Sequence, residues 1–262
     1  QLTDLHVRPH GMLANRVVET NAMLEPALQH VAALEPVPDA VIMSGDLADG
    51  GLAEEYAILA DLIRRHLKMP VYLIPGNHDR REAMKQGLRG LPGIADDPEF
   101  IQYTVDDFPL RLVMLDSIVP GASYGELCAA RLAFLDHALA AAPEKPTLVV
   151  LHHPPIPVGI GFMDEINLRT GDAFAAVLAR HPQVERVLCG HHHRPIVARF
   201  AGTIVQVAPS TAHQVTLALA PGAPESLNLE PPAYLLHRWT AETGVVSHQA
   251  YVDRYPGPYP FA

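Results

Sequence analysis

The sequence predicts an α/β fold, and three observations support that class. Short apolar strands alternate with longer segments of helical apolar spacing along most of the 262 residues. Polar side chains follow the early strands without a spacer. Proline and glycine separate the segments, as expected at turns. Alternation of this kind is typical of parallel βαβ units with right-handed crossovers.

The first half of the chain carries the clearest alternation. Residues 21–34 and 54–67 have helical apolar spacing, and residues 40–43 and 71–74 are buried strands. Pro75-Gly76 ends the second of these strands, because proline lacks a donor and glycine accepts positive φ. Gln1–Thr3 resemble a shortened strand, so we expect the natural chain to begin a few residues earlier.

The second half continues with further strands and two helices. The expected strands are 100–105, 111–115, 147–151, 184–189, 196–200 and 203–207, and the expected helices are 127–142 and 171–180. Residues 234–239 and 245–251 alternate like a hairpin, and the proline-rich tail can form neither helix nor central strand. We therefore divide the chain into a main domain, residues 1–215, and a C-terminal hairpin and proline-rich tail, residues 216–262, which we expect to form an oligomer contact or a cap.

Composition excludes several classes of partner. With 19 basic and 29 acidic residues the formal charge is −10, whereas binding of a nucleic-acid backbone needs a basic surface. No stretch approaches the roughly 18 apolar residues of a membrane span. The two cysteines, Cys128 and Cys189, form no disulfide framework, which favours a reducing compartment. We expect a cytoplasmic protein that binds neither membrane nor nucleic acid.

Five predicted strands end in side chains that can bind metal ions. These are Asp4 and His6; Asp46; Asn77 and His78; His152 and His153; and His191, His192 and His193. The carboxyl ends of parallel strands meet at one edge of a sheet, so we expect these groups to converge. In extended backbone, the side chains of residues i and i+2 point the same way. The side chains of Asp4 and His6 could therefore address one point, and so could those of His191 and His193.

A single histidine after a strand is more often a hydrogen-bonded structural residue than a metal ligand. Five clusters of possible ligands, each after a strand, make coincidence a poor explanation. Carboxylate, imidazole and amide donors without thiolate suit iron, manganese, zinc or cobalt. Seven or more donors exceed the needs of one ion. Two divalent ions that share a bridging carboxylate fit the count.

These motifs resemble those of the calcineurin-like metallophosphoesterase superfamily. The superfamily pattern D-x-H, G-D, G-N-H-D, H and G-H-x-H matches, in order, Asp4–His6, Gly45-Asp46, Gly76–Asp79, His152 and Gly190–His193. The chain is most similar to bacterial class III phosphodiesterases, especially the glycerophosphodiesterase branch. Residues 152–155, 212–215 and 255–258 support this narrower match.

The resemblance implies a four-layer αββα sandwich of two mixed β-sheets flanked by helices, with a small C-terminal β element. It also implies that Asp46 bridges the two ions. The implied ligands are Asp4, His6, Asp46 and His193 for one ion, and Asp46, Asn77, His152 and His191 for the other. His78 would be the catalytic histidine that faces the substrate. His213 would contact the substrate, although a buried histidine after a strand explains it about equally well.

The implied activity is hydrolysis of phosphodiesters, either glycerophosphodiester-like or 3′,5′-cyclic nucleotides, by a hydroxide that bridges the two metals. Phosphomonoesterase activity on the same metals is the first alternative, because nothing in the motifs separates the substrates. A non-catalytic metal-binding scaffold is a weaker alternative, since such scaffolds typically lose ligands that are all present here. We expect a small phosphodiester as partner and a homo-oligomer.

Overall fold

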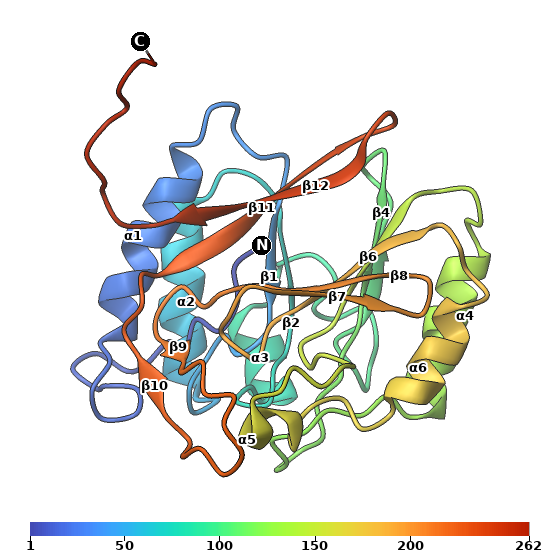
Figure 1. Cartoon of the computed structure of the whole chain (residues 1–262), viewed down its shortest axis with the longest axis horizontal. Coiled ribbons are helices and arrows are strands. Elements are labelled where there is room, and N and C mark those ends of the chain that lie inside the picture. Colours follow the sequence, from blue (N-terminus) through green and yellow to red (C-terminus); the bar gives the residue numbers. More distant parts are fainter. Residues whose placement is uncertain (262) are drawn as a thin grey trace.

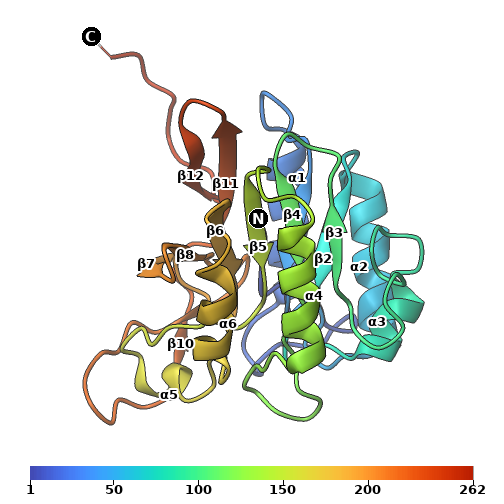
Figure 2. The same ribbon diagram turned by 90° about the vertical axis from the view of Figure 1, so that its right-hand side faces the viewer.

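The computed structural model describes residues 1–261, and its helices and sheets form four layers (Figure 1). Helices α1 (Thr20–Ala32) and α2 (Ala53–His66) cover one side. Helices α4 (Ala129–Ala140) and α6 (Gly171–Leu178) cover the opposite side, as the turned view in Figure 2 also shows. Two sheets lie between these pairs of helices. The predicted αββα arrangement is therefore confirmed.

The first sheet is built around two short parallel strands. β1 (Val41–Ser44) pairs in register with β2 (Val71–Ile74). On the other side of β1, Leu2 donates its N–H to the carbonyl of Ile42 at 2.8 Å. All eight residues of the two strands are buried, because helices lie on one face of this sheet and the second sheet lies on the other.

The second sheet has six strands and mixed direction. In spatial order its strands are β3 (Tyr103–Val105), β4 (Arg111–Met114), β5 (Thr147–Val150), β6 (Val184–Cys189), β8 (Thr203–Val207) and β7 (Ile196–Phe200). The four central strands β4, β5, β6 and β8 run parallel to one another. β3 and β7 pair antiparallel at the two edges, so the sheet is mixed.

Alternation along the second sheet divides the interior into two cores. Leu112, Met114 and Leu148 pack toward the first sheet, within the cluster that also holds α1 and α2. Val113 and Val149, one position away, pack with α4 and α6. Successive side chains of a strand point to opposite faces, which gives this split. The two sheets are thus held at a fixed separation by buried aliphatic side chains from both.

The C-terminal hairpin joins the edge of the first sheet. β11 (Ala233–Thr240) and β12 (Gly244–Tyr251) pair antiparallel over eight residue pairs. Gln1 donates its N–H to the Leu235 carbonyl at 2.7 Å and accepts the Leu235 N–H at 3.1 Å, as in an antiparallel pair. The Arg186 guanidinium of β6 contacts Ser247 and the Val245 carbonyl, which ties the hairpin to the second sheet.

Some short elements differ from the sequence prediction. The structure adds α3 (Arg81–Gly87), α5 (Gly161–Asp164), and the pair β9 (Gln214–Val215) and β10 (Leu227–Asn228). The strand predicted at 100–105 begins only at Tyr103. The backbone N–H groups of Phe100 and Ile101 donate to the carboxylates of Asp97 and Asp116, so they are not available to a β-ladder.

The loops that follow the strands gather at one edge of the molecule, near α5, β9 and β10 in Figure 1. Within residues 1–261, no helix combines the length and the apolar character that a membrane span requires. Cys128 and Cys189 are both free thiols. The edge with the loops is where the predicted site residues lie.

Candidate metal centre

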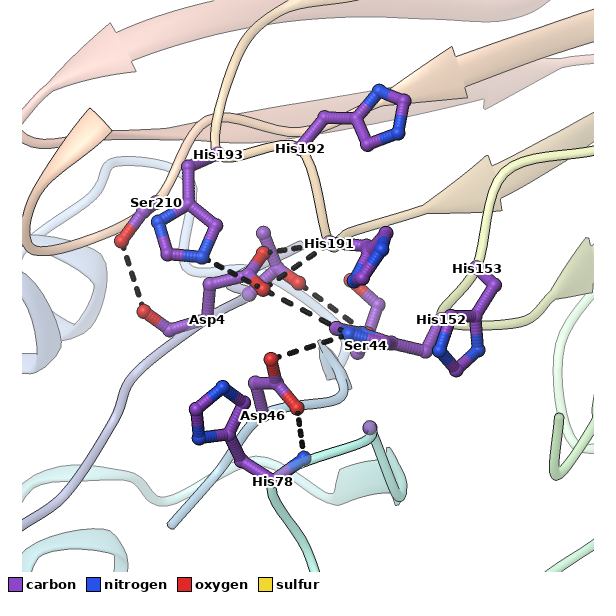
Figure 3. Close-up of polar contacts among 12 residues, drawn as sticks. Asp4, Ser44, Asp46, His78, His152, His153, His191, His192, His193 and Ser210 are labelled. Atoms are coloured by element: carbon purple, nitrogen blue, oxygen red, sulfur yellow. Dashed lines mark hydrogen bonds and ion pairs between the residues drawn. The ribbon is translucent and has the colours of Figure 1, made fainter. Parts of the chain in front are cut away.

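The first group of predicted ligands converges on one point. Asp4, His6, Asp46 and His193 each place one oxygen or nitrogen within 4.8 Å of the others, and all four residues are buried. Figure 3 shows Asp4, Asp46 and His193 of this group. The Nε2 atoms of His6 and His193 are 3.2 Å apart, and His193 Nε2 is 3.2 Å from Asp4 Oδ1. This is the set that the resemblance assigns to the first ion.

The orientation of these imidazoles suits metal binding. His6 Nδ1 lies 3.0 Å from Asp49 Oδ1, and His193 Nδ1 lies 2.9 Å from the His213 carbonyl. Both oxygens are acceptors, so each Nδ1 carries the proton and each Nε2 presents a lone pair to the centre. Two lone pairs 3.2 Å apart repel unless a proton or a cation lies between them. Histidine ligands of metal ions are commonly held through their second nitrogen in this way.

The second group contains three buried atoms that lack hydrogen-bond partners. They are Asn77 Oδ1, His152 Nε2 and His191 Nε2, judged over the described chain. His152 Nδ1 donates to the Ser44 carbonyl at 2.8 Å, which leaves its Nε2 as a lone pair. A buried polar atom without a partner costs about 1–3 kcal/mol. A cation bound by all three atoms would remove that cost.

Asp46 lies between the two groups. Its Oδ2 is 3.8 Å from His6 Nε2, in the first group, and 3.4 Å from His152 Nε2, in the second. Asp46 Oδ1 accepts the backbone N–H of His78 at 2.9 Å, which holds the carboxylate in this orientation. The position matches the bridging role that the resemblance implies.

The backbone at five of the seven predicted ligands is left-handed rather than extended. The φ angles are 53° at Asp4, 47° at His6, 50° at Asp46, 72° at His191 and 50° at His193. The expectation of an extended backbone at these pairs is therefore wrong. Asp4 and His6 nevertheless lie in one group, as expected, whereas His193 lies in the first group and His191 lies beside His152. Such φ values cost of order 1–3 kcal/mol each and cluster at functional sites.

Two glycines allow the loops to approach one another. Gly45 has φ +98°, and a Cβ on it would overlap the imidazole of His152. A Cβ on Gly76 would overlap the backbone N and the carboxylate of Asp46. The glycines of the G-D and G-N-H-D motifs are thus needed for close packing of the loops that follow β1 and β2.

The predicted catalytic residue, His78, lies beside the first group and reaches solvent. Its ring centroid is 4.7 Å from that of His6, and 41% of its side chain is exposed. His78 Nδ1 donates to the Asp49 carbonyl at 2.8 Å, which directs Nε2 away from that loop. Burial lowers the pKa of His78, but the Asp46 charge and the Asp49 carbonyl outweigh it, so the pKa is raised.

His213 also joins the edge of the first group. Its ring centroid is 4.7 Å from that of His193 and 5.3 Å from that of His6. Asn15 Nδ2 lies 3.3 Å from His213 Nε2, while His213 Nδ1 is buried without a partner among residues 1–261. Burial, then the nearby imidazoles of His193 and His6, lower the pKa of His213 to about 3, so it is neutral near pH 7.

His153 differs from the predicted ligands, although it follows the same strand as His152. Its Nδ1 lies 2.8 Å from the Ser117 hydroxyl and its Nε2 lies 3.2 Å from the Ser123 carbonyl. The carbonyl fixes the proton on Nε2, so the hydroxyl donates to Nδ1. Both nitrogens are satisfied, which leaves no lone pair for an ion even though the ring adjoins His152 and His191.

Sequence reasoning missed Asp49, which contacts two histidines of the site. Its carboxylate holds His6 Nδ1, its carbonyl accepts from His78, and Arg8 Nη1 lies 2.9 Å from its Oδ2. Asp49 follows Asp46 by three residues on the same loop. Nothing in its sequence environment separates it from a solvent-exposed loop carboxylate, so only the fold could identify it.

Asp79, the last residue of the G-N-H-D motif, binds backbone N–H groups rather than an imidazole. Its carboxylate accepts N–H groups of Leu47, Ala48 and Gly76 at 2.8 to 3.1 Å. The Tyr56 hydroxyl adds a fourth hydrogen bond at 2.9 Å. Asp79 therefore fixes the loop after β1, which carries Asp46, against the loop after β2.

The donor set fits two divalent ions. Two carboxylates and four imidazoles lie at the same edge, divided into two groups that meet at Asp46. The seventh donor, Asn77 Oδ1, follows β2 and is buried without a partner among residues 1–261. Ions of the first transition series and zinc accept this mixture of oxygen and nitrogen. The buried unpaired atoms of the second group are the observation that supports the second ion.

Comparison with known proteins matches the chain to one family and to several named relatives. The family described as calcineurin-like phosphoesterase matches residues 1–195. A chain from Arcobacter nitrofigilis named "Probable glycerophosphodiester phosphodiesterase GpdQ" is 37% identical over 100% of this chain and 95% of its own length. The 3′,5′-cyclic adenosine monophosphate phosphodiesterase CpdA of Vibrio vulnificus is 32% identical over 82% of this chain and 76% of its own.

A solved structure shares the fold at low sequence identity. The dimetal phosphatase from Danio rerio superimposes with a TM-score of 0.64 at 16% identity, covering 96% of this chain and 98% of that one. The resemblance found in the motifs is thus confirmed over most of the sequence. The chain belongs to the calcineurin-like phosphoesterase family.

Proposed function

We propose that this chain hydrolyses phosphodiesters at a centre of two divalent metal ions. The observation that carries the proposal is that two carboxylates and four imidazoles form two groups that meet at Asp46, with His152 Nε2 and His191 Nε2 buried and unpaired in the second group. The names of the relatives, a glycerophosphodiester phosphodiesterase and a cyclic nucleotide phosphodiesterase, support the choice of diesters.

Paired metal ions supply a water of lowered pKa and neutralise charge that develops on the phosphoryl oxygens. The residues of the chain supply positioning and proton transfer. His78 Nε2, with Nδ1 held by the Asp49 carbonyl, faces outward, where it can donate a proton to a phosphoryl oxygen or to the departing alkoxide. Neutral His213 offers its Nδ1–H as a second hydrogen-bond donor beside the first group.

The role of His78 can be tested by varying the leaving group. We expect His78→Ala to lower kcat about 10²–10⁴-fold for an alkyl diester, whose alkoxide needs a proton. For a p-nitrophenyl diester, whose leaving group is stable without a proton, the loss should be much smaller. Metal content, measured by elemental analysis, should match the parent. Equal losses of kcat on both substrates would show that His78 does not protonate the leaving group.

Glycerophosphodiesters and 3′,5′-cyclic nucleotides are both candidate substrates. Phosphomonoesters are the alternative on the same site, and a scaffold without activity is a further alternative. A panel containing glycerophosphocholine, cyclic AMP and p-nitrophenyl phosphate, assayed with metal-stripped protein reloaded with one ion at a time, separates these possibilities. Turnover of the monoester alone would reject the proposed diesterase, and no turnover with any ion would favour the scaffold.

We further propose that the ions are iron, manganese, zinc or cobalt and that the chain forms a homo-oligomer through residues 216–262. Support for the oligomer comes from exposed aromatic side chains in this region, Tyr251, Tyr255, Tyr259 and Phe261. Light scattering of the chain with and without the tail tests it.

The two free thiols favour a cytoplasmic location.

A further inference from the structure

His192 lies between two predicted ligands in the chain but takes no part in the metal centre. Figure 3 shows its ring turned away from the carboxylates of Asp4 and Asp46. The side chain is fully buried, and its Nε2 lies 2.7 Å from Asn167 Oδ1. The site described above assigns no role to this imidazole.

The hydrogen bond between His192 and Asn167 can form in only one sense. Asn167 Nδ2 lies 2.9 Å from the Ile156 carbonyl, so the amide nitrogen donates there and Oδ1 is the acceptor. His192 Nε2 must then carry the proton and donate to Oδ1. The bond therefore needs both the orientation of the Asn167 amide and an N–H at the tip of residue 192.

Asn167 lies in the connection between β5 and α6, and we term residues 154–170 of this connection the β5–α6 loop. The loop is tied to itself, because the Asp164 carboxylate accepts the N–H groups of Val158 and Gly159 at 2.7 and 2.9 Å. It is also tied to the loop after β4, since the Gly125 N–H donates to the Asn167 carbonyl at 3.2 Å. The β5–α6 loop is thus one unit, which His192 joins to the loop after β6.

The β5–α6 loop lies beside the candidate site. It begins directly after His152 and His153, and its α5 lies at the same edge of the molecule as β9 in Figure 1. Ile160 and Met163 of this loop pack against Val215, two residues after His213. The loop therefore connects the side of the site that holds His152 with the side that holds His213.

We propose that His192 is a positioning residue that holds the β5–α6 loop and thereby sets which alcohol groups of a phosphodiester the site accepts. The inference rests on the proposed diesterase activity and assigns specificity to a residue outside the metal centre. Loss of the bond should change the fit of the ester group that does not leave, because that group must extend beyond the metals toward the surrounding loops. Chemistry at the phosphoryl group should change little.

Two variants remove the bond from opposite sides. His192→Phe keeps the ring and removes the N–H, and Asn167→Ala removes the acceptor at a position that is not adjacent to a predicted ligand. His192→Gln places an amide N–H at a similar distance from the backbone, so it should restore the hydrogen bond to Asn167 and serves as the conservative variant. His30→Phe is the matched control, since His30 bonds Tyr234 at 3.0 Å on another part of the fold.

The assay compares methyl p-nitrophenyl phosphate with phenyl p-nitrophenyl phosphate, which share a leaving group and differ in the retained ester. We expect His192→Phe and Asn167→Ala to change the phenyl-to-methyl ratio of kcat/KM about tenfold, mainly through KM, as loss of about one hydrogen bond predicts. kcat on the methyl ester and metal content should match the parent. His192→Gln should restore the ratio, and His30→Phe should leave it unchanged.

Hydrogen exchange of the metal-loaded proteins gives a readout that does not require turnover. Faster exchange in residues 154–170 of both variants, with unchanged exchange after β1, supports the inference. Unchanged exchange in this loop, or an equal loss on both esters, overturns it while the parent remains a diesterase. If the parent hydrolyses neither these esters nor the natural diesters, the proposed function fails first, and the specificity role fails with it.

Discussion

Removal of one partner of the buried ion pair between Arg81 and Asp116 should be among the most destabilising single substitutions in this chain. Arg81 Nε and Nη2 donate to the two carboxylate oxygens of Asp116 at 2.6 and 2.8 Å. The Asp116 side chain is fully buried and that of Arg81 is 12% exposed. Arg81 begins α3, directly after the G-N-H-D loop, so the pair also fixes that loop to the end of β4.

The expected cost of Asp116→Asn follows from these contacts. The change leaves the Arg81 guanidinium buried without its counter-charge, next to a second guanidinium, Arg131, whose Nη1 is 3.8 Å from Asp116. Breaking a buried pair by removing one partner costs about 3–5 kcal/mol. For a chain of this size that corresponds to a fall in Tm of roughly 6–20 °C. Arg81→Met combined with Asp116→Asn should recover part of the loss.

Urea unfolding at fixed metal concentration, with the slope m compared between variants, measures the loss. Asp61→Asn is the matched control, because Asp61 pairs with Arg65 at 2.7 Å but both side chains are about half exposed. Water screens that pair, so its removal should have a far smaller effect. If Asp116→Asn lowered the free energy of unfolding no more than Asp61→Asn, the reasoning from burial would be refuted.

Three further predictions concern the metal centre. Asn77→Ala should weaken binding of one ion by about tenfold or more, while the other ion still binds. Calorimetric titration of metal-stripped protein with Mn²⁺ measures this, and an isotherm identical to that of the parent would contradict it. Gly45→Ala should destabilise the fold by more than about 1 kcal/mol, because φ at Gly45 is +98° and the new Cβ would overlap His152. A urea midpoint equal to that of the parent would contradict this close approach of the two loops. Chelation should lower Tm, since an ion present at 100 times its Kd stabilises by about 2.7 kcal/mol; a Tm indifferent to added metal would argue against the site.

Most helices and strands follow from local pattern. β2, β6, β7 and β8 have the predicted bounds, because alternating or continuous apolar runs between turn residues depend on few distant contacts. α3 was not predicted, since a seven-residue helix with one buried side chain, Met84, has almost no apolar periodicity. β9 and β10 have two residues each. They are strands only because they pair with each other, and nothing in their residue types predicts that pairing.

The site was predictable in its location and less so in its details. Parallel strands place their carboxyl ends at one edge, so the motifs alone indicated convergence of Asp4, Asp46 and His152. The resemblance assigned His191 and His193 to different ions, but the left-handed φ angles at both residues follow from no sequence period. Likewise His152 and His153 are identical residues in neighbouring positions, and only the hydrogen bonds to Ser117 and Ser123 show which of them is satisfied.

The sequence by itself determined the α/β class, the edge at which function resides and the chemistry of the donors, because these depend on local apolar period and on residue type. The tertiary structure decided which nitrogen of each histidine is free, which loops Asp49 and Asp79 hold, and where His192 points. Those properties depend on contacts between segments up to about two hundred residues apart, such as the one between Asp4 and His193. Such contacts exist only after the two sheets have packed together.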